Sequence, residues 1–138
     1  MCSSDLRAAA GDDTDLIRFE PPDVGQRFDV LPLSVVTDGA VQALGVDRRR
    51  LRPNIVVGGV EGVAERGWPG RILRIGDTVE IEIRKLRARC VMTTYDPDTL
   101  EQDLGVLGRI VHDFDGRIAL DCAVRRGGRI SVGDPVEV

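Results

Sequence analysis

The chain has 138 residues, of which 42% are hydrophobic and 30% are charged, and its formal net charge at pH 7 is -4. This length predicts one domain that can bury a core without a disulfide or a structural metal. No apolar run approaches the roughly 18 residues of a membrane span, and the net negative charge argues against general nucleic-acid binding. We therefore expect neither a membrane nor a nucleic acid as partner.

The first residues are expected to lie outside the domain. Residues 1–6, MCSSDL, are what the translated end of a common sequencing adapter would give, so we interpret them as an assembly artefact. An ordinary disordered N-terminus is the alternative. Residues 1–15 are predicted to be disordered or artefactual, and residues 8–15 lack the pattern of a secretory signal. The domain is predicted to span residues 28–138.

The first half of the domain alternates extended and turn signals. Residues 28–36 are apolar and β-branched and predict a strand. Thr37 is placed to cap the N-terminus of a short helix that Gly45 closes. Residues 52–57 predict a second strand, and a loop containing Trp68, Pro69 and Gly70 follows.

A hairpin is predicted next. Residues 71–75 and 78–84 flank the two-residue turn Gly76-Asp77. The second strand alternates apolar Val79, Ile81 and Ile83 with polar residues, which indicates that one face is buried.

The last part of the chain predicts three more strands and a helix. Strands are expected at residues 90–94, 117–124 and 131–138, and a helix at 100–114, where apolar residues recur every three or four positions. Many short strands with two or three short helices predict a mainly β fold, most simply a barrel.

Three short motifs resemble a known family. They are RLRPNIVV at 50–57, RCVMTTYDP at 89–97 and GDPV at 133–136. In this order and spacing they are similar to the MOSC domain, named after the C-terminal part of molybdenum cofactor sulfurases. The resemblance covers residues 28–138 and implies a MOSC-type β-barrel that binds a molybdenum-pterin cofactor (molybdopterin).

The resemblance implies that Cys90 supplies a thiolate to the molybdenum and is catalytic. A thiolate is a soft ligand, and nearby positive charge favours its formation. Arg87 and Arg89 precede Cys90, but strand alternation would place both on the face opposite to the cysteine. A buried structural thiol is the alternative reading of Cys90.

Further cofactor-binding residues are carried over from the family. Arg52 and Asn54, two apart on the predicted strand, would point to the same side and bind the terminal phosphate or ring edge of the pterin. Arg89 is also predicted to bind the cofactor. Thr37 could offer its hydroxyl and the amides behind it to an anionic group, or it could be a helix cap only.

The residues after the cysteine have two readings. Thr93, Thr94 and Asp96 match the family's pattern and could order the substrate side of the metal, with Asp96 as a second catalytic residue. Asp96-Pro97-Asp98 also reads as an ordinary turn. Where related enzymes tend to show a glycine and an aromatic residue, this chain has Ala119 and Asp121.

Three other residues are assigned no chemistry. Cys122 is expected in the core, and His112 is expected to be a solvated helix residue. Families of this kind are sometimes described as binding pyridoxal phosphate, but Lys85, the candidate for a Schiff base, shows no sign of that role. Cys2, Cys90 and Cys122 have no zinc-ligand spacing, which indicates a reduced, cytoplasmic protein.

The resemblance to amidoxime-reducing molybdoenzymes implies an oxidoreductase that reduces N-hydroxylated or other N-oxygenated small molecules. The sequence contains no iron–sulfur, flavin or nicotinamide motif, so a separate electron-donor protein is implied. The alternative is a sulfur-carrier or cofactor-handling domain that uses a persulfide on Cys90. A third possibility is a truncated chain that folds but binds nothing.

Overall fold

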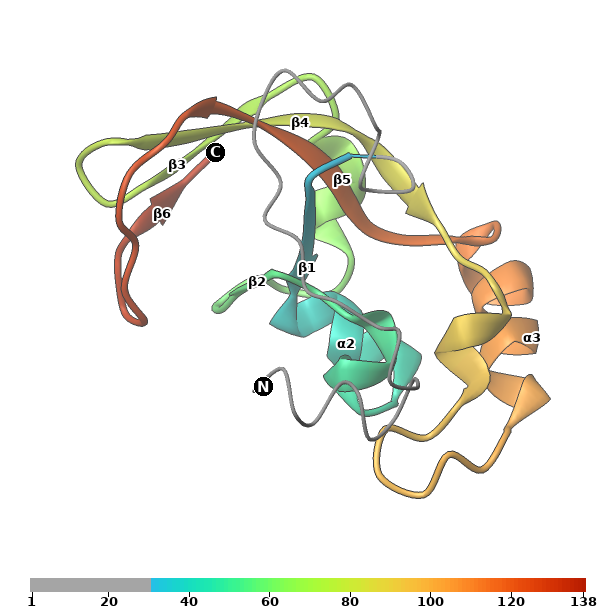
Figure 1. Ribbon diagram of the computed structural model, residues 1–138. Coiled ribbons are helices and arrows are strands. Elements are labelled where there is room, and N and C mark those ends of the chain that lie inside the picture. Colours follow the sequence, from blue (N-terminus) through green and yellow to red (C-terminus); the bar gives the residue numbers. More distant parts are fainter. Residues whose placement is uncertain (1–30) are drawn as a thin grey trace, which may run out of the picture.

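The structure is a computed structural model that describes residues 31–138, and the expectations for residues 1–15 and for the first part of the strand at 28–36 lie outside this range. A six-stranded sheet dominates it, with strand order β2-β1-β5-β4-β3-β6 (Figure 1). The strands are β1 (Leu33–Thr37), β2 (Ile55–Val57), β3 (Ile72–Ile75), β4 (Val79–Ala88), β5 (Arg117–Arg126) and β6 (Val136–Glu137).

The sheet curls into a nearly closed mixed barrel. Only β1 and β2 pair in parallel, and every other neighbouring pair is antiparallel. The long strands β4 and β5 pair with three register shifts, which bend and twist the sheet. The prediction of a mainly β barrel with a few short helices is confirmed.

The barrel interior is apolar, as the alternation of β4 predicts. Val79, Ile81 and Ile83 are buried on one face of the strand. They pack with residues of the neighbouring strands into one cluster, which also contains Val35, Val57, Leu73, Ile75, Leu120 and Cys122. This cluster fills the inside of the barrel and excludes solvent from it. Close packing of this kind makes the barrel the rigid part of the fold.

A second apolar cluster lies between the sheet and the helices α2 (Asp38–Leu44) and α3 (Leu104–Phe114). The predicted caps of α2 are confirmed: Thr37 Oγ1 accepts from the amide of Ala40, and Gly45 ends the helix in a left-handed conformation. The apolar recurrence at 100–114 predicted one face of Leu100, Leu104, Leu107, Val111 and Phe114, and of these only Phe114 is buried. Leu104 and Val111 are exposed, while Val106, Ile110 and Phe114 are buried.

Four predicted elements are corrected. The strand at 90–94 is instead a short 3-10 helix, η3 (Val91–Thr94). The strand at 52–57 contracts to β2 because residues 48–51 form another 3-10 helix, η1 (Arg48–Leu51), which ends at Arg52. The strand at 131–138 contracts to β6, and the helix at 100–114 begins only at Leu104. A third 3-10 helix, η2 (Ala64–Gly67), precedes β3.

Candidate functional site

Cys90 lies where the chain leaves the sheet. β4 ends at Ala88, Cys90 is extended, and η3 begins with the next residue. The thiol is free and the residue is exposed, so the buried structural reading is wrong. Both the amide and the hydroxyl of Thr93 donate to the carbonyl of Cys90, at 3.2 and 2.9 Å. The turn of η3 therefore presents the cysteine at the end of the barrel where β4 stops, which we call the rim.

The guanidinium of Arg89 is held beneath this rim. Its Nη2 donates to the carbonyl oxygen of Leu51 at 2.6 Å. Its Nε and Nη1 are buried and have no hydrogen-bond partner among residues 31–138. The pKa of Arg89 is lowered to about 10, chiefly by burial and to a smaller extent by the nearby Arg87, while Cys90 acts in the opposite direction. Buried donors are normally satisfied, so two guanidinium donors without an acceptor indicate room for an anionic partner.

The charge of a second arginine, Arg87, is balanced by a buried carboxylate on the neighbouring strand. Arg87 Nη1 forms an ion pair with Oδ1 of Asp121, a carboxylate on β5 that is only 1% exposed. Asp121 stands where the resembling family tends to have an aromatic residue. Ala119, where that family tends to have glycine, adopts a left-handed φ of 73°. The two expected departures from the family's pattern thus have different forms. Asp121 takes part in an ion pair, and Ala119 adopts a backbone conformation that glycine usually adopts.

The run of arginines at 48–52 divides between two tasks. Arg49 pairs with Asp47 and with Asp98, and Arg50 pairs with Asp96 and donates to the carbonyl of Thr94. These contacts tie η1 to the loop that follows η3. Arg48 and Arg52, with the ion-paired Arg49, line an open cavity of about 700 Å³, whose other lining residues are Asp38, Pro53, Val56, Gly58 and Val132.

The expected geometry of Arg52 and Asn54 is wrong. Arg52 is in the left-handed region, with φ of 47°, so the two residues do not alternate on a strand. Arg52 lines the larger cavity, and Asn54 lines an adjacent one of about 260 Å³ at the open edge of the barrel. Asn54 Oδ1 accepts from the amide of Ser34 at 2.7 Å, which turns its side-chain NH2 away from β1. Val56 and Val132 line both cavities.

Thr37 is separated from the rim. It is fully buried, its hydroxyl donates to Glu65 Oε2 at 3.1 Å, and the same oxygen accepts from the amide of Ala40. Both hydrogen-bonding capacities of Thr37 are therefore used inside the fold. The helix-cap reading accounts for this residue, and its proposed contact with an anionic group stays a prediction.

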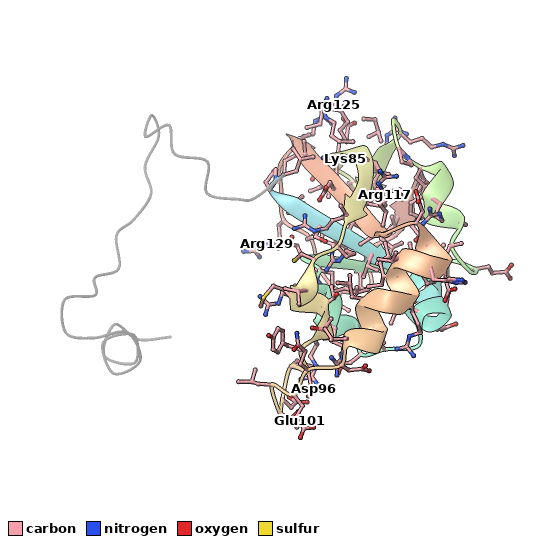
Figure 2. The ribbon with its side chains drawn as sticks, turned by 90° about the vertical axis from the view of Figure 1, so that its right-hand side faces the viewer. Lys85, Asp96, Glu101, Arg117, Arg125 and Arg129 are labelled. Atoms are coloured by element: carbon pink, nitrogen blue, oxygen red, sulfur yellow. The ribbon has the colours of Figure 1, made fainter. Side chains whose placement is uncertain are left out.

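Thr94 and Asp96 serve the local turn. Thr94 Oγ1 donates to the carbonyl of Val91 at 2.6 Å and accepts from Gln102. Asp96 Oδ1 accepts from the amides of residues 98 and 99, and these amides, with Arg50, hold the pKa of Asp96 below its ordinary value. The turn reading of Asp96-Pro97-Asp98 describes this geometry. Figure 2 shows Asp96 and Glu101 together at one end of the molecule.

The site residues that come together are Cys90, Arg89 and Arg52. Arg89 follows β4, its guanidinium reaches the carbonyl of Leu51 in η1, and Arg52 is the residue directly after Leu51. Sequence reasoning missed the roles of Arg50 and Asp121. The proximity of Arg50 to Asp96, 46 residues apart, depends on the packing of η1 against η3 and has no sequence signal. The polar Asp121 within an otherwise apolar strand was the signal available for the other.

Two further observations concern metal-ligand clusters and membrane-spanning helices in the described part of the chain. No group of three or more His, Cys, Asp or Glu residues that could hold a metal ion occurs in the described part of the chain. Among residues 31–138, no helix is long and apolar enough to cross a membrane.

Comparison with known proteins identifies the class. Residues 33–137 match the MOSC domain, and the chain belongs to this family. The human mitochondrial amidoxime reducing component 2 is 30% identical over 141 residues, covering 83% of this chain and 41% of that protein. The human mitochondrial amidoxime-reducing component 1 is 33% identical over 99 residues, covering 66% of this chain and 26% of that protein. The chain thus spans less than half the length of these curated relatives, and it is a molybdenum cofactor-associated domain.

Proposed function

We propose that this domain binds the molybdenum-pterin cofactor, with Cys90 as the metal ligand, as part of an oxidoreductase that reduces N-hydroxylated or other N-oxygenated small molecules. The observation that carries the proposal is the pair of buried, unpartnered guanidinium nitrogens of Arg89 next to an exposed cysteine. Buried donors are normally satisfied, so a missing acceptor is expected at this position. The terminal phosphate of the pterin has the charge and the oxygen atoms that this acceptor requires.

Each neighbouring residue has a distinct task in this proposal. Arg89 and Arg52 bind the phosphate, and Arg48 on the cavity wall adds positive charge. Asn54, whose amide oxygen is engaged with Ser34, offers its NH2 group to the ring edge. Thr93 holds the carbonyl of Cys90 and so orients the thiol.

The loop after the cysteine takes a positioning role rather than a direct one. Asp96 is fixed by Arg50 and by two backbone amides. We propose that Thr94 and Asp96 keep the substrate side of the rim in place, with Asp96 close to the substrate. Thr37 acts further away, as the cap that fixes α2 behind the site.

The bound cofactor would supply a two-electron redox centre. Reduction of an N-hydroxylated substrate to the corresponding amine consumes two electrons and two protons and releases one water. We therefore propose a separate electron-donor protein as partner. The names of the relatives support the substrate class, since they describe proteins that reduce amidoximes.

The compartment is also a proposal. The two cysteines of the described residues, Cys90 and Cys122, are free thiols, which suits a reducing compartment such as the cytoplasm. The relatives are named as mitochondrial proteins. Pyridoxal phosphate is not proposed, because Lys85 is exposed on β4, outside any cavity described above (Figure 2).

The test is the molybdenum and pterin content of the protein purified from a host that makes the cofactor. We expect near-stoichiometric metal in the natural sequence and loss of metal in Cys90→Ala. Cys122→Ala is a poor control because that residue is in the core, so Cys2→Ala serves as the matched cysteine variant. Arg89→Met should lower the pterin content while leaving the thiol in place.

Two other outcomes have a clear meaning. Absence of molybdenum from both the natural sequence and Cys90→Ala would overturn the ligand proposal. Cyanide-labile sulfur on Cys90 in that metal-free protein would instead favour the sulfur-carrier alternative, which an exposed thiol at the rim can also serve.

A further inference from the structure

We propose that Asp121 is a built-in counter-ion of the anion site: through its ion pair with Arg87 it offsets the charge of the Arg87 and Arg89 guanidinium groups and sets how tightly they bind an oxyanion of the phosphate class. This inference deepens the proposed function and rests on it only in taking Arg89 as an anion-binding group. Asp121 and Arg87 are then positioning residues, because they act through Arg89.

The position of Asp121 supports this role. Its residue on β5 lies opposite Ser34 on β1 and Lys85 on β4. Leu120 and Cys122 on either side belong to the apolar interior, and Asp121 itself is buried outside that cluster. A buried carboxylate is costly unless it is paired, and Arg87 is the partner that the described residues provide.

The charges around Arg89 explain why the pair affects ligand binding. Arg87 and Arg52 both disfavour the positive charge of Arg89, while Asp121 and Cys90 favour it. In the structure this buried carboxylate pairs with Arg87, which precedes Arg89 by two residues at the end of β4. One nitrogen of Arg87 pairs with this carboxylate, and the Arg87 side chain is 24% exposed. Arg89 has two buried nitrogens without a partner in residues 31–138. The carboxylate balances one of the two positive charges and leaves the other for a ligand.

This arrangement differs from an ion pair that serves the fold alone. If the pair were purely structural, removal of either partner would disturb the site in the same direction. If Asp121 is a counter-ion, the two removals have opposite signs. Loss of the carboxylate leaves two cations for the ligand, whereas loss of Arg87 frees the carboxylate to neutralise Arg89 and compete with the ligand.

The experiment measures the binding of inorganic phosphate to the cofactor-free protein by titration calorimetry at constant ionic strength. We expect Asp121→Asn to tighten phosphate binding about tenfold and Arg87→Met to weaken it about tenfold, as expected for one charge at short range. The double variant, Asp121→Asn with Arg87→Met, should bind within about threefold of the natural sequence, because one charge of each sign is removed.

Two controls separate the possible failures. Arg89→Met should abolish phosphate binding, and Arg125→Met, at the opposite end of the molecule from Asp96 (Figure 2), should leave it unchanged. If one single variant fails to fold, the other single variant and the double variant still test the sign. Tightening by both single variants, weakening by both, or a double variant as weak as Arg87→Met would overturn the counter-ion role.

Failure of the proposed function gives a different pattern. A protein that never takes up molybdenum but shows opposite signs for the two single variants would retain the counter-ion and lose the cofactor proposal. A protein that takes up molybdenum through Cys90 but shows no phosphate binding, or equal signs, would retain the cofactor proposal and lose the counter-ion.

Discussion

The two free cysteines of the described residues occupy opposite surroundings. Cys122 on β5 is fully buried in the apolar interior of the barrel, and burial, with a smaller effect of Asp121, raises the pKa of its thiol to about 12. Cys90 is exposed at the end of β4, beside the guanidinium of Arg89. The same side chain is therefore a packing element in the interior and an accessible thiol at the end of β4.

The largest expected difference between these regions is in thiol reactivity. At pH 8 iodoacetamide should label Cys90 at least about 100 times faster than Cys122, because the buried thiol reacts only when the structure opens. Mass spectrometry of the individual cysteine peptides measures the two rates and reads Cys2 separately. In concentrated urea the rates should converge. Similar rates in the folded protein would show that the interior is not closed around Cys122.

The same contrast predicts different effects on folding stability. Cys122→Ser should lower the free energy of unfolding by about 1–3 kcal/mol, because it places an unpaired hydroxyl among apolar side chains. Cys90→Ser should change it by less than about 0.5 kcal/mol, as is usual for exposed positions. Urea denaturation followed by circular dichroism gives both values. An equal loss in the two variants would mean that Cys90 is packed in solution.

The interior was predictable because one rule governs it. The period of two in Val79, Ile81 and Ile83 follows from strand geometry, and the buried face is the one that this rule selects. The cap of α2 by Thr37 was predictable for a similar reason, since it depends on neighbours three residues apart.

The rim was less predictable because it is built where those rules stop. The alternation that placed Arg89 and Cys90 on opposite faces applies to a strand, and β4 ends before either residue. Arg52 leaves η1 in a left-handed conformation, which a sequence rule assigns to glycine or asparagine rather than to arginine before a proline. The motifs predicted which residues form the site, but its geometry depends on contacts between η1 and η3, which are distant in sequence.

The buried carboxylate of Glu65, which accepts from the N-cap residue of α2, provides another stability prediction. Glu65 is 1% exposed, and burial raises its pKa even though Thr37 donates to it. A raised pKa in the folded state means that folding favours the protonated acid, so this contribution is complete at low pH and is lost as the pH rises through the folded pKa. Glu65→Gln should therefore raise the free energy of unfolding by about 1 kcal/mol at pH 8 and leave it nearly unchanged at pH 4.

Thermal unfolding across this pH range measures the effect of Glu65→Gln. The exposed Glu61→Gln serves as the matched control and should change little at either pH. A gain for Glu65→Gln that is larger at pH 4 than at pH 8 would contradict the assigned direction of the pKa shift.

The smallest expected effect concerns Ala119, which precedes the buried pair Asp121 and Cys122 on β5. Its φ of 73° costs an alanine about 1 kcal/mol that glycine avoids, while glycine loses a similar amount of chain entropy on folding. Ala119→Gly should therefore change the free energy of unfolding by at most about 0.5 kcal/mol, whereas Ala123→Gly on the same strand should cost about 1 kcal/mol. Urea denaturation of the two variants compares them directly. Equal losses would show that Ala119 is not held in the left-handed conformation.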